Sequence, residues 1–191
     1  RQMCIRDRKY GVQLVVRSSL NNNEGTIVRE EVNMEKMLVS GVAADKNATR
    51  IAVIGLKDEP GIAFHLFNAL AKYNINVDII LQSVGRNGTK DISFTVAEDE
   101  ADEAVAIIQK SFPKSEYNKI DEEKDVAKIS IVGAGMMTHP GVAASMFEAL
   151  YDAGVNIKMI STSEIRVTVL IDEKYTERAL NAVHDKFALG D

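Results

Sequence analysis

The sequence predicts an α+β fold of two similar modules, each with the order strand, helix, strand, strand, helix, strand. The stretch 50–82 returns in altered form at 128–161, and such an internal repeat indicates two copies of one supersecondary unit. In both copies an apolar run precedes Pro-Gly, apolar residues at helical spacing follow, and an Asn then precedes alternating residues. Because proline is favoured in the first turn of a helix, Pro60 and Pro140 mark the predicted helix starts.

The first module is predicted to span residues 49–122. Its elements are a strand over 49–56, a helix over 60–73, strands over 75–84 and 91–97, a helix over 99–112 and a closing strand over 116–120. Ile92, Phe94 and Val96 alternate with polar residues, and the Asn-Gly before them is a strong hairpin signal. This βαββαβ order is the ferredoxin-like one.

The second module repeats this order over residues 125–191, but the chain ends before a fourth strand. Its predicted strands cover 129–132, 155–161 and 164–171, and its helices cover 140–153 and 173–187. An unpaired sheet edge invites pairing, and the unassigned strand of suitable length is 37–44, with Leu38 and Val42 expected to be buried. We therefore predict that residues 37–46 complete the second module, so that the first is inserted within the second.

The residues before these modules do not form a domain of their own. Residues 1–8 match no pattern around them and are interpreted as an artefactual or disordered start. Residues 9–36 contain one apolar run at 12–16, which predicts a strand followed by a loop, and then a charged linker. Since one strand cannot form a domain, residues 9–36 are interpreted as the end of a larger domain and a linker.

Composition and charge exclude several classes of function. The net charge of −5 argues against a nucleic-acid partner, and the single cysteine, Cys4, excludes an internal disulfide and any cysteine-based metal site. The three histidines share no ligand spacing, so no metal is expected. There is no apolar window long enough to cross a bilayer and no secretion signal, so we expect no membrane partner and a cytoplasmic location.

Two other readings of the motifs are weaker. Gly133-Ala134-Gly135 hints at a dinucleotide fingerprint, but Thr138 stands where the third glycine belongs and no lysine follows as in a phosphate loop. RNA-binding modules share the βαββαβ order, yet they need stacking aromatics and a basic face. Phe94 alone does not meet that need.

The sequence closely resembles the paired ACT domains at the carboxyl end of aspartate kinases. The resemblance rests on DEPGIA, HPGVAA, NINVDIILQSV, GTKDISFTV, SIVGAGM and MISTSEIRVTVLID, while KYGVQLVVRSS resembles the end of their kinase domain. It covers residues 9–190 and implies two ferredoxin-like ACT domains preceded by a remnant of the kinase domain. It also implies a regulatory region, in some members a separate beta subunit, that binds lysine, threonine or both and thereby inhibits phosphorylation of aspartate by ATP.

The resemblance further implies what this chain lacks and what it binds. The nucleotide and aspartate residues of the kinase have no counterpart, so we expect no catalytic residues and no activity from the chain alone. ATP and magnesium are implied for the full kinase and no cofactor for this chain. The implied partners are a kinase domain or catalytic subunit and a second copy of the chain, paired through the ACT domains. The alternative is a free-standing amino-acid-sensing or dimerisation module that regulates another enzyme.

The chemistry of a free amino acid points to a matching set of groups. Its receptor needs N–H donors for the carboxylate, an acceptor for the ammonium and one group that reads the side chain. The helix starts supply N–H donors, Asp58 and Asp78 supply negative charge, and Gln82, on the same predicted strand face as Asp78, can donate and accept. Carried over by motif, the effector positions of the family are Asp58, Ala63, Asn76, Val77, Asp78, Gln82, Val142, Ala143, Asn156, Ile157, Ser163 and Glu164.

The two copies are not equivalent, because Lys158 occupies the place of Asp78. A site shared between modules or subunits is therefore favoured over two equal sites in one chain. Simpler roles stay open from the sequence alone: Asp58 as a helix cap, Asn76 and Asn156 as turn residues, and Gln82 and Glu164 as solvated strand residues.

Overall fold

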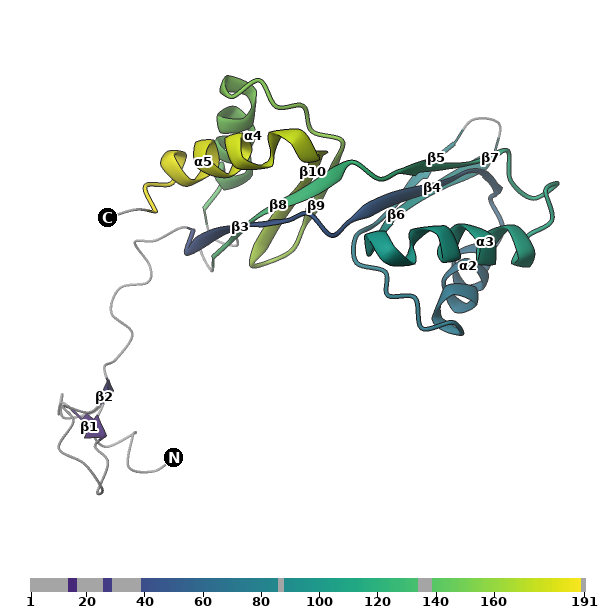
Figure 1. The fold of residues 1–191 in the computed structure, drawn as a ribbon, viewed down its shortest axis with the longest axis horizontal. Helices are drawn as coiled ribbons and strands as arrows, with labels where there is room; N and C mark the ends of the chain where they lie inside the picture. The colour runs from purple at the N-terminus through teal and green to yellow at the C-terminus, as the bar shows by residue number, and fades with distance from the viewer. Residues whose placement is uncertain (1–13, 17–25, 29–38, 86–87, 134–138, 190–191) are drawn as a thin grey trace. The chain divides into compact units, whose positions relative to one another are not determined.

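The computed structural model describes residues 14–16, 26–28, 39–85, 88–133 and 139–189, which belong to two units, Arg1–Met37 and Leu38–Asp191 (Figure 1). In the first unit, β1 (Leu14–Val16) pairs antiparallel with β2 (Thr26–Val28). The apolar run thus forms a strand as predicted, but β2 lies where a loop was predicted. The expected start at 1–8 and the linker over 29–35 lie outside the described residues.

Module 1, as we call residues 49–123, contains a four-stranded antiparallel sheet in the order β5-β6-β4-β7. Its strands are β4 (Thr49–Lys57), β5 (Ile80–Val84), β6 (Thr89–Val96) and β7 (Lys119–Glu123). One face of the sheet is covered by α2 (Ile62–Ala71) and α3 (Ala101–Ser111), the latter preceded by the short 3₁₀ helix η2 (Glu98–Glu100) (Figure 1). This is the predicted βαββαβ order.

Module 2 contains the other four-stranded sheet, in the order β3-β8-β10-β9. Its strands are β3 (Gly41–Asp45), β8 (Val126–Val132), β9 (Met159–Thr162) and β10 (Arg166–Asp172), and its helices are α4 (Val142–Asp152), η4 (Glu173–Tyr175) and α5 (Thr176–Lys186). β3 pairs antiparallel with β8, from Gly41 opposite Val132 to Asp45 opposite Lys128. The predicted interleaving is confirmed, because a strand that precedes module 1 completes the sheet that follows it.

Each module buries an apolar core between its sheet and its two helices. In module 1 the alternating Ile92, Phe94 and Val96 of β6 pack with Leu66 and Leu70 of α2, as the period-2 pattern predicts. The core of module 2 includes Ile129, Ile131, Met146, Leu150 and Val183. A third, smaller cluster joins the two modules and consists of Ala48, Ile79, Val126, Met159 and Leu170.

The helix starts differ from the prediction. α2 begins at Ile62 and α4 at Val142, so each proline precedes its helix instead of lying in the first turn. The residues at the helix N-caps are Gly61 and Gly141, with φ of 96° and 99°. Residues with a side chain rarely adopt this left-handed backbone conformation. The glycine of each Pro-Gly pair therefore provides the backbone conformation that starts the helix.

Several strand boundaries also shift, since β3 begins at Gly41 instead of residue 37 and β9 covers Met159–Thr162 instead of 155–161. β5 covers only Ile80–Val84 of the predicted 75–84, and Leu81 on it is 36% exposed. β7 begins three residues later than predicted: Asn118 N–H donates to the carbonyl of Ile54, and the ladder with β4 runs from Lys119. Near β3, Val39 is buried and Val42 is half-buried, while Leu38 lies outside the described residues.

Candidate functional site

The predicted effector positions of module 1 fall at two ends of its sheet. At the outer end, Asp58 follows β4 and Ala63 lies in the first turn of α2. Asp58 does not cap the helix, since its carboxylate pairs with Lys90 Nζ at 2.7 Å and Gly61 is the cap residue. Gln82 lies exposed on the edge strand β5.

The other end of module 1 lies at the junction with module 2. Asn76, Val77 and Asp78 stand just before β5, with Asn76 exposed and Val77 half-buried. The backbone N–H of Asp78 donates to Thr95 O at 3.1 Å. Its carboxylate accepts a hydrogen bond from Lys128 Nζ of β8 at 2.8 Å, so it already has a cationic partner from module 2.

Module 2 repeats this division into two ends. Val142, buried, and Ala143, half-buried, form the first turn of α4 at the outer end. Ser163 and Glu164 lie exposed between β9 and β10, and Ser163 N–H donates to Arg166 O at 2.7 Å. Before β9, at the opposite end of that strand, stand the exposed Asn156 and the half-buried Ile157. Within one chain, therefore, the predicted positions do not converge on a single point.

Ion pairs between the modules are a feature that the sequence did not reveal. Lys128 Nζ lies 2.8 Å from Asp78 of module 1 and 2.9 Å from Asp45 of β3. Lys158 bonds Asp172 of module 2 at 2.8 Å and also contacts Glu123 of module 1. Burial acts to lower the pKa of Lys128, but its hydrogen bonds to Asp45 and Asp78 outweigh that effect and hold the pKa above its usual value.

Each copy of the repeat contributes a group of three charged residues at the junction of the modules. The two groups occupy equivalent positions but differ in the sign of their central charge. Lys128 lies opposite Asp45 in module 2 as Arg50 lies opposite Glu123 in module 1. The equivalent triads are Asp78, Lys128 and Asp45 on one side and Lys158, Arg50 and Glu123 on the other. A cation stands between two carboxylates in the first triad, and a carboxylate stands between two cations in the second. The substitution of lysine for aspartate in the repeat thus makes the junction asymmetric.

These ion pairs predict how stability responds to acid. Burial alone would raise the pKa of Glu123, but hydrogen bonds from Lys158 and Arg50 outweigh it and lower the pKa. Burial would likewise raise the pKa of Asp45, but hydrogen bonds from Lys128 and a backbone N–H lower it. Carboxylates with depressed folded-state pKa values stabilise above their unfolded values, about 3.9 for Asp and 4.3 for Glu, and lose that contribution as pH falls through the folded-state pKa. The thermal midpoint should therefore stay level from pH 7 to 5 and fall towards pH 3. A Glu123→Gln variant should show a shallower fall, and an acid-insensitive midpoint would contradict the assignment.

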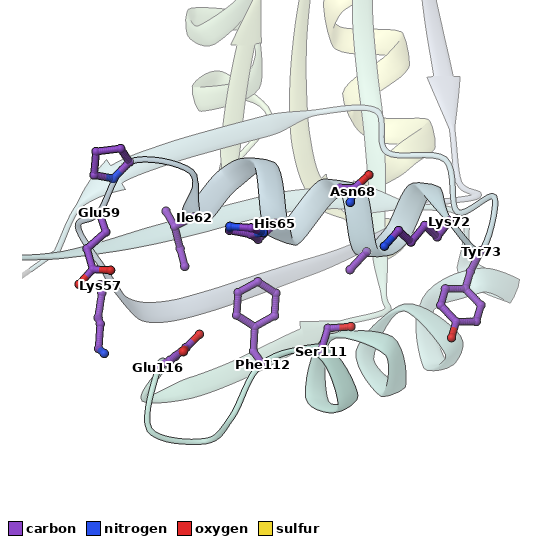
Figure 2. Close-up of a pocket in the computed structure, with 12 residues that line it drawn as sticks. Lys57, Glu59, Ile62, His65, Asn68, Lys72, Tyr73, Ser111, Phe112 and Glu116 are labelled. Atoms are coloured by element: carbon purple, nitrogen blue, oxygen red, sulfur yellow. The ribbon is translucent and has the colours of Figure 1, made fainter.

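One cavity of about 550 Å³ lies apart from the predicted positions, between α2 and the segment after α3. Figure 2 shows that His65 of α2 and Phe112 of the segment after α3 line it, with Lys57 and Glu116 at one end and Lys72 at the other. None of the twelve predicted effector positions lines it. It is therefore not the candidate site.

The described ranges contain neither a cluster of metal ligands nor a membrane-spanning helix. No cluster of three or more metal-ligating side chains occurs among these residues. None of the helices in the same ranges has the length and apolar character needed to span a bilayer.

Two interleaved modules, each a four-stranded antiparallel sheet covered by two helices, define a class, the paired ACT-domain regulatory proteins. A model of the ACT domain family matches residues 51–112 and 129–187. The aspartokinase of Helicobacter pylori is 43% identical over 187 residues, a match that covers 95% of this chain and 46% of that protein. The aspartokinase of Corynebacterium glutamicum is 42% identical over 188 residues, covering 96% and 45%.

Two similar solved structures match over a shorter part of this chain. The ligand-free regulatory subunit of aspartate kinase from Thermus thermophilus is 42% identical, with a TM-score of 0.72, covering 78% of this chain and 98% of that one. One chain in a structure of aspartokinase alpha and beta subunits is 46% identical, with a TM-score of 0.73, covering 79% and 99%. The chain belongs to the aspartokinase family, as its regulatory region of paired ACT domains. It spans less than half the length of the two curated relatives described.

Proposed function

We propose that this chain is the regulatory part of an aspartokinase, which binds lysine, threonine or both and thereby lowers the ATP-dependent phosphorylation of aspartate. The observation that carries the proposal is the match to a regulatory subunit of aspartate kinase over 98% of that subunit at 42% identity. ATP and magnesium belong, on this proposal, to the kinase domain or catalytic subunit. E. coli aspartokinase III in complex with lysine and aspartate has a TM-score of 0.66 at 21% identity, which is a likeness of fold and does not select the effector here.

We also propose that residues 9–36 are the end of the kinase domain and a linker. The match to the H. pylori aspartokinase covers 95% of this chain. The unmatched 5% is shorter than the unit Arg1–Met37, so part of that unit aligns with the complete kinase. This alignment supports the kinase-remnant interpretation over a free-standing module that serves another enzyme.

The edge strands offer a route to the proposed homodimer. β5 and β9 each have a strand partner on one side only. Apolar side chains are exposed on both, with Ile80 at 48% and Val84 at 85% on β5 and Ile160 at 40% on β9. Exposed apolar edges are templates for pairing with another chain. We propose that β5 of one copy pairs antiparallel with β9 of the second copy.

Such pairing accounts for the division of the predicted positions. An antiparallel partner brings the start of one strand beside the end of the other. The segment Asn76–Asp78 at the start of β5 then lies near the end of β9, where Ser163 and Glu164 follow, in the second copy. Each effector site is thereby completed by both copies, in accord with the shared site that the unequal repeat favours.

Thermal unfolding of the 191-residue chain with each common amino acid tests the proposal. At a ligand concentration of about 100 times Kd, binding stabilises the folded state by about 2.7 kcal/mol, and each kcal/mol raises Tm by roughly 2–4 °C at this size. Lysine or threonine should therefore raise Tm by roughly 5–10 °C, while the D-enantiomers, which present the same charges, serve as controls. If no amino acid raises Tm above its D-enantiomer, the proposed function is wrong.

A further inference from the structure

A β-bulge interrupts β4 of module 1 shortly before the segment that leads into α2. On β4, residues 54 and 55 stand opposite the single residue Asp91 of β6, which is the pattern of a bulge. Gly55 has a φ of 76°, a conformation that residues with a side chain rarely adopt. Because side chains alternate along a strand, an uninterrupted β4 would turn Leu56 away from the core that contains Val53. The extra residue restores the phase, and both side chains are 0% exposed.

The bulge is held from two sides. The backbone N–H of Gly55 donates to Asp91 Oδ1 at 2.8 Å. On the side of β7, Asn118 N–H donates to the carbonyl of Ile54 at 2.8 Å. The Asn118 side chain also fills the space that a Cβ on Gly55 would occupy. Two residues from different segments, Asp91 and Asn118, thus fix the conformation of the bulge.

The equivalent glycine of module 2 is held in a different way. Gly133 directly follows β8 and occupies the place of Gly55 in the repeat. Its N–H donates to the backbone carbonyl of Ile165 at 2.9 Å, and a backbone acceptor is present whatever the side chain. In module 1 the acceptor belongs to a side chain. The hold on the module 1 bulge therefore depends on the identity of Asp91 and can be removed by a substitution.

The bulge also sets the direction of the segment that connects β4 to α2. Within this segment, Glu59 N–H donates to Lys57 O at 3.0 Å, so the turn is closed by its own backbone and its orientation follows the end of β4. Lys90, the residue before Asp91, pairs with the Asp58 carboxylate at 2.7 Å. Two adjacent residues of β6 thus hold the bulge and the predicted effector position that follows it.

We propose that Asp91 is a positioning residue of the effector site, which fixes the bulge at Gly55 and thereby the placement of Asp58 and Ala63. It acts through the backbone and does not contact the ligand. The inference rests on the proposed function, because the placement of these two positions matters to binding only if the segment receives an effector. Binding groups that are already in place lose less freedom when the ligand arrives, so a loosened bulge lowers the affinity.

Three substitutions of Asp91 separate the position of the acceptor from its charge. In calorimetric titrations of the full chain with lysine and threonine, Asp91→Ala should weaken binding by about tenfold, because the N–H of Gly55 loses its acceptor. Asp91→Asn keeps an acceptor oxygen in the same place and should bind within about twofold of wild type. Asp91→Glu keeps the charge but displaces the carboxylate by one methylene, and it should weaken binding by about threefold or more.

A core variant, Ile108→Val, controls for a general loss of stability. Ile108 of α3 is 0% exposed in the core of module 1, so removing one methyl group lowers the thermal midpoint and leaves the acceptor of Gly55 in place. This variant should bind lysine and threonine as the wild type does. An equal loss of affinity in Ile108→Val and Asp91→Ala would show that stability, and not positioning, is responsible, and would overturn the inference.

The other outcomes separate this inference from the proposed function. Wild-type affinity in Asp91→Ala, or weaker binding in Asp91→Asn than in Asp91→Glu, overturns the positioning role and leaves the proposed function standing. If circular dichroism shows Asp91→Ala unfolded, the order of affinity in Asp91→Asn and Asp91→Glu decides. A wild-type chain that binds neither amino acid contradicts the proposed function itself, and the positioning role falls with it.

Discussion

Deleting residues 1–44 should unfold or aggregate module 2, whereas deleting residues 1–37 should leave the unit Leu38–Asp191 folded. β3 pairs with β8 along its whole length, from Gly41 to Asp45. Val39, just before β3, is 3% exposed and lies in the core of module 2, against which Val42 also packs. Removing these residues opens the core and turns β8 into a bare edge that can pair with other chains.

The expected loss follows from the buried area. Full burial of one valine side chain contributes about 1.5–3 kcal/mol, so losing Val39 and part of Val42 costs roughly 2–4 kcal/mol before the ladder hydrogen bonds are counted. With roughly 2–4 °C per kcal/mol at this size, the midpoint should fall by about 10 °C. Circular dichroism and light scattering during heating measure both effects. Equal midpoints and equal scattering for the two truncations would show that β3 is dispensable.

The parts of the fold that the sequence predicts well are those set by periodicity. Ile92, Phe94 and Val96 fill one core as their alternation requires, and the missing fourth strand of the second repeat is found at β3. Predictions that depended on a single local rule were less accurate. Proline was expected inside the helix, but the left-handed φ of Gly61 and Gly141 shows that the cap conformation determines the motif.

The site shows a similar limit. The motif match predicts Asp78 as an effector position, but nothing local predicts that it pairs with Lys128, 50 residues later. That contact depends on how β8 packs beside the segment before β5, which is tertiary information. One sequence signal was available, since Lys158 in the place of Asp78 already indicated that the two copies differ. The structure gives this difference a physical form in two triads of opposite central charge.

In the complete kinase that contains this regulatory region, Asp78→Ala should raise the lysine or threonine concentration for half-inhibition by about tenfold or more. The carboxylate of Asp78 is the proposed acceptor for the ligand ammonium, and losing a charge-assisted hydrogen bond weakens binding by about this factor. The substitution also frees Lys128 from module 1 and leaves it paired with Asp45. The measurement is the rate of aspartate-dependent ATP consumption against effector concentration.

Asp102→Ala is the matched control for this prediction. Asp102 is also an acidic residue of module 1 with a lysine partner, Lys124 Nζ at 2.8 Å, but its side chain is 84% exposed and it is not one of the predicted effector positions. A solvated surface pair of this kind contributes little, so half-inhibition should occur at the wild-type concentration. An equal shift in both variants would indicate a general weakening of module 1. A wild-type response in Asp78→Ala would remove Asp78 from the effector site, because the proposed contact with the ligand ammonium requires its carboxylate.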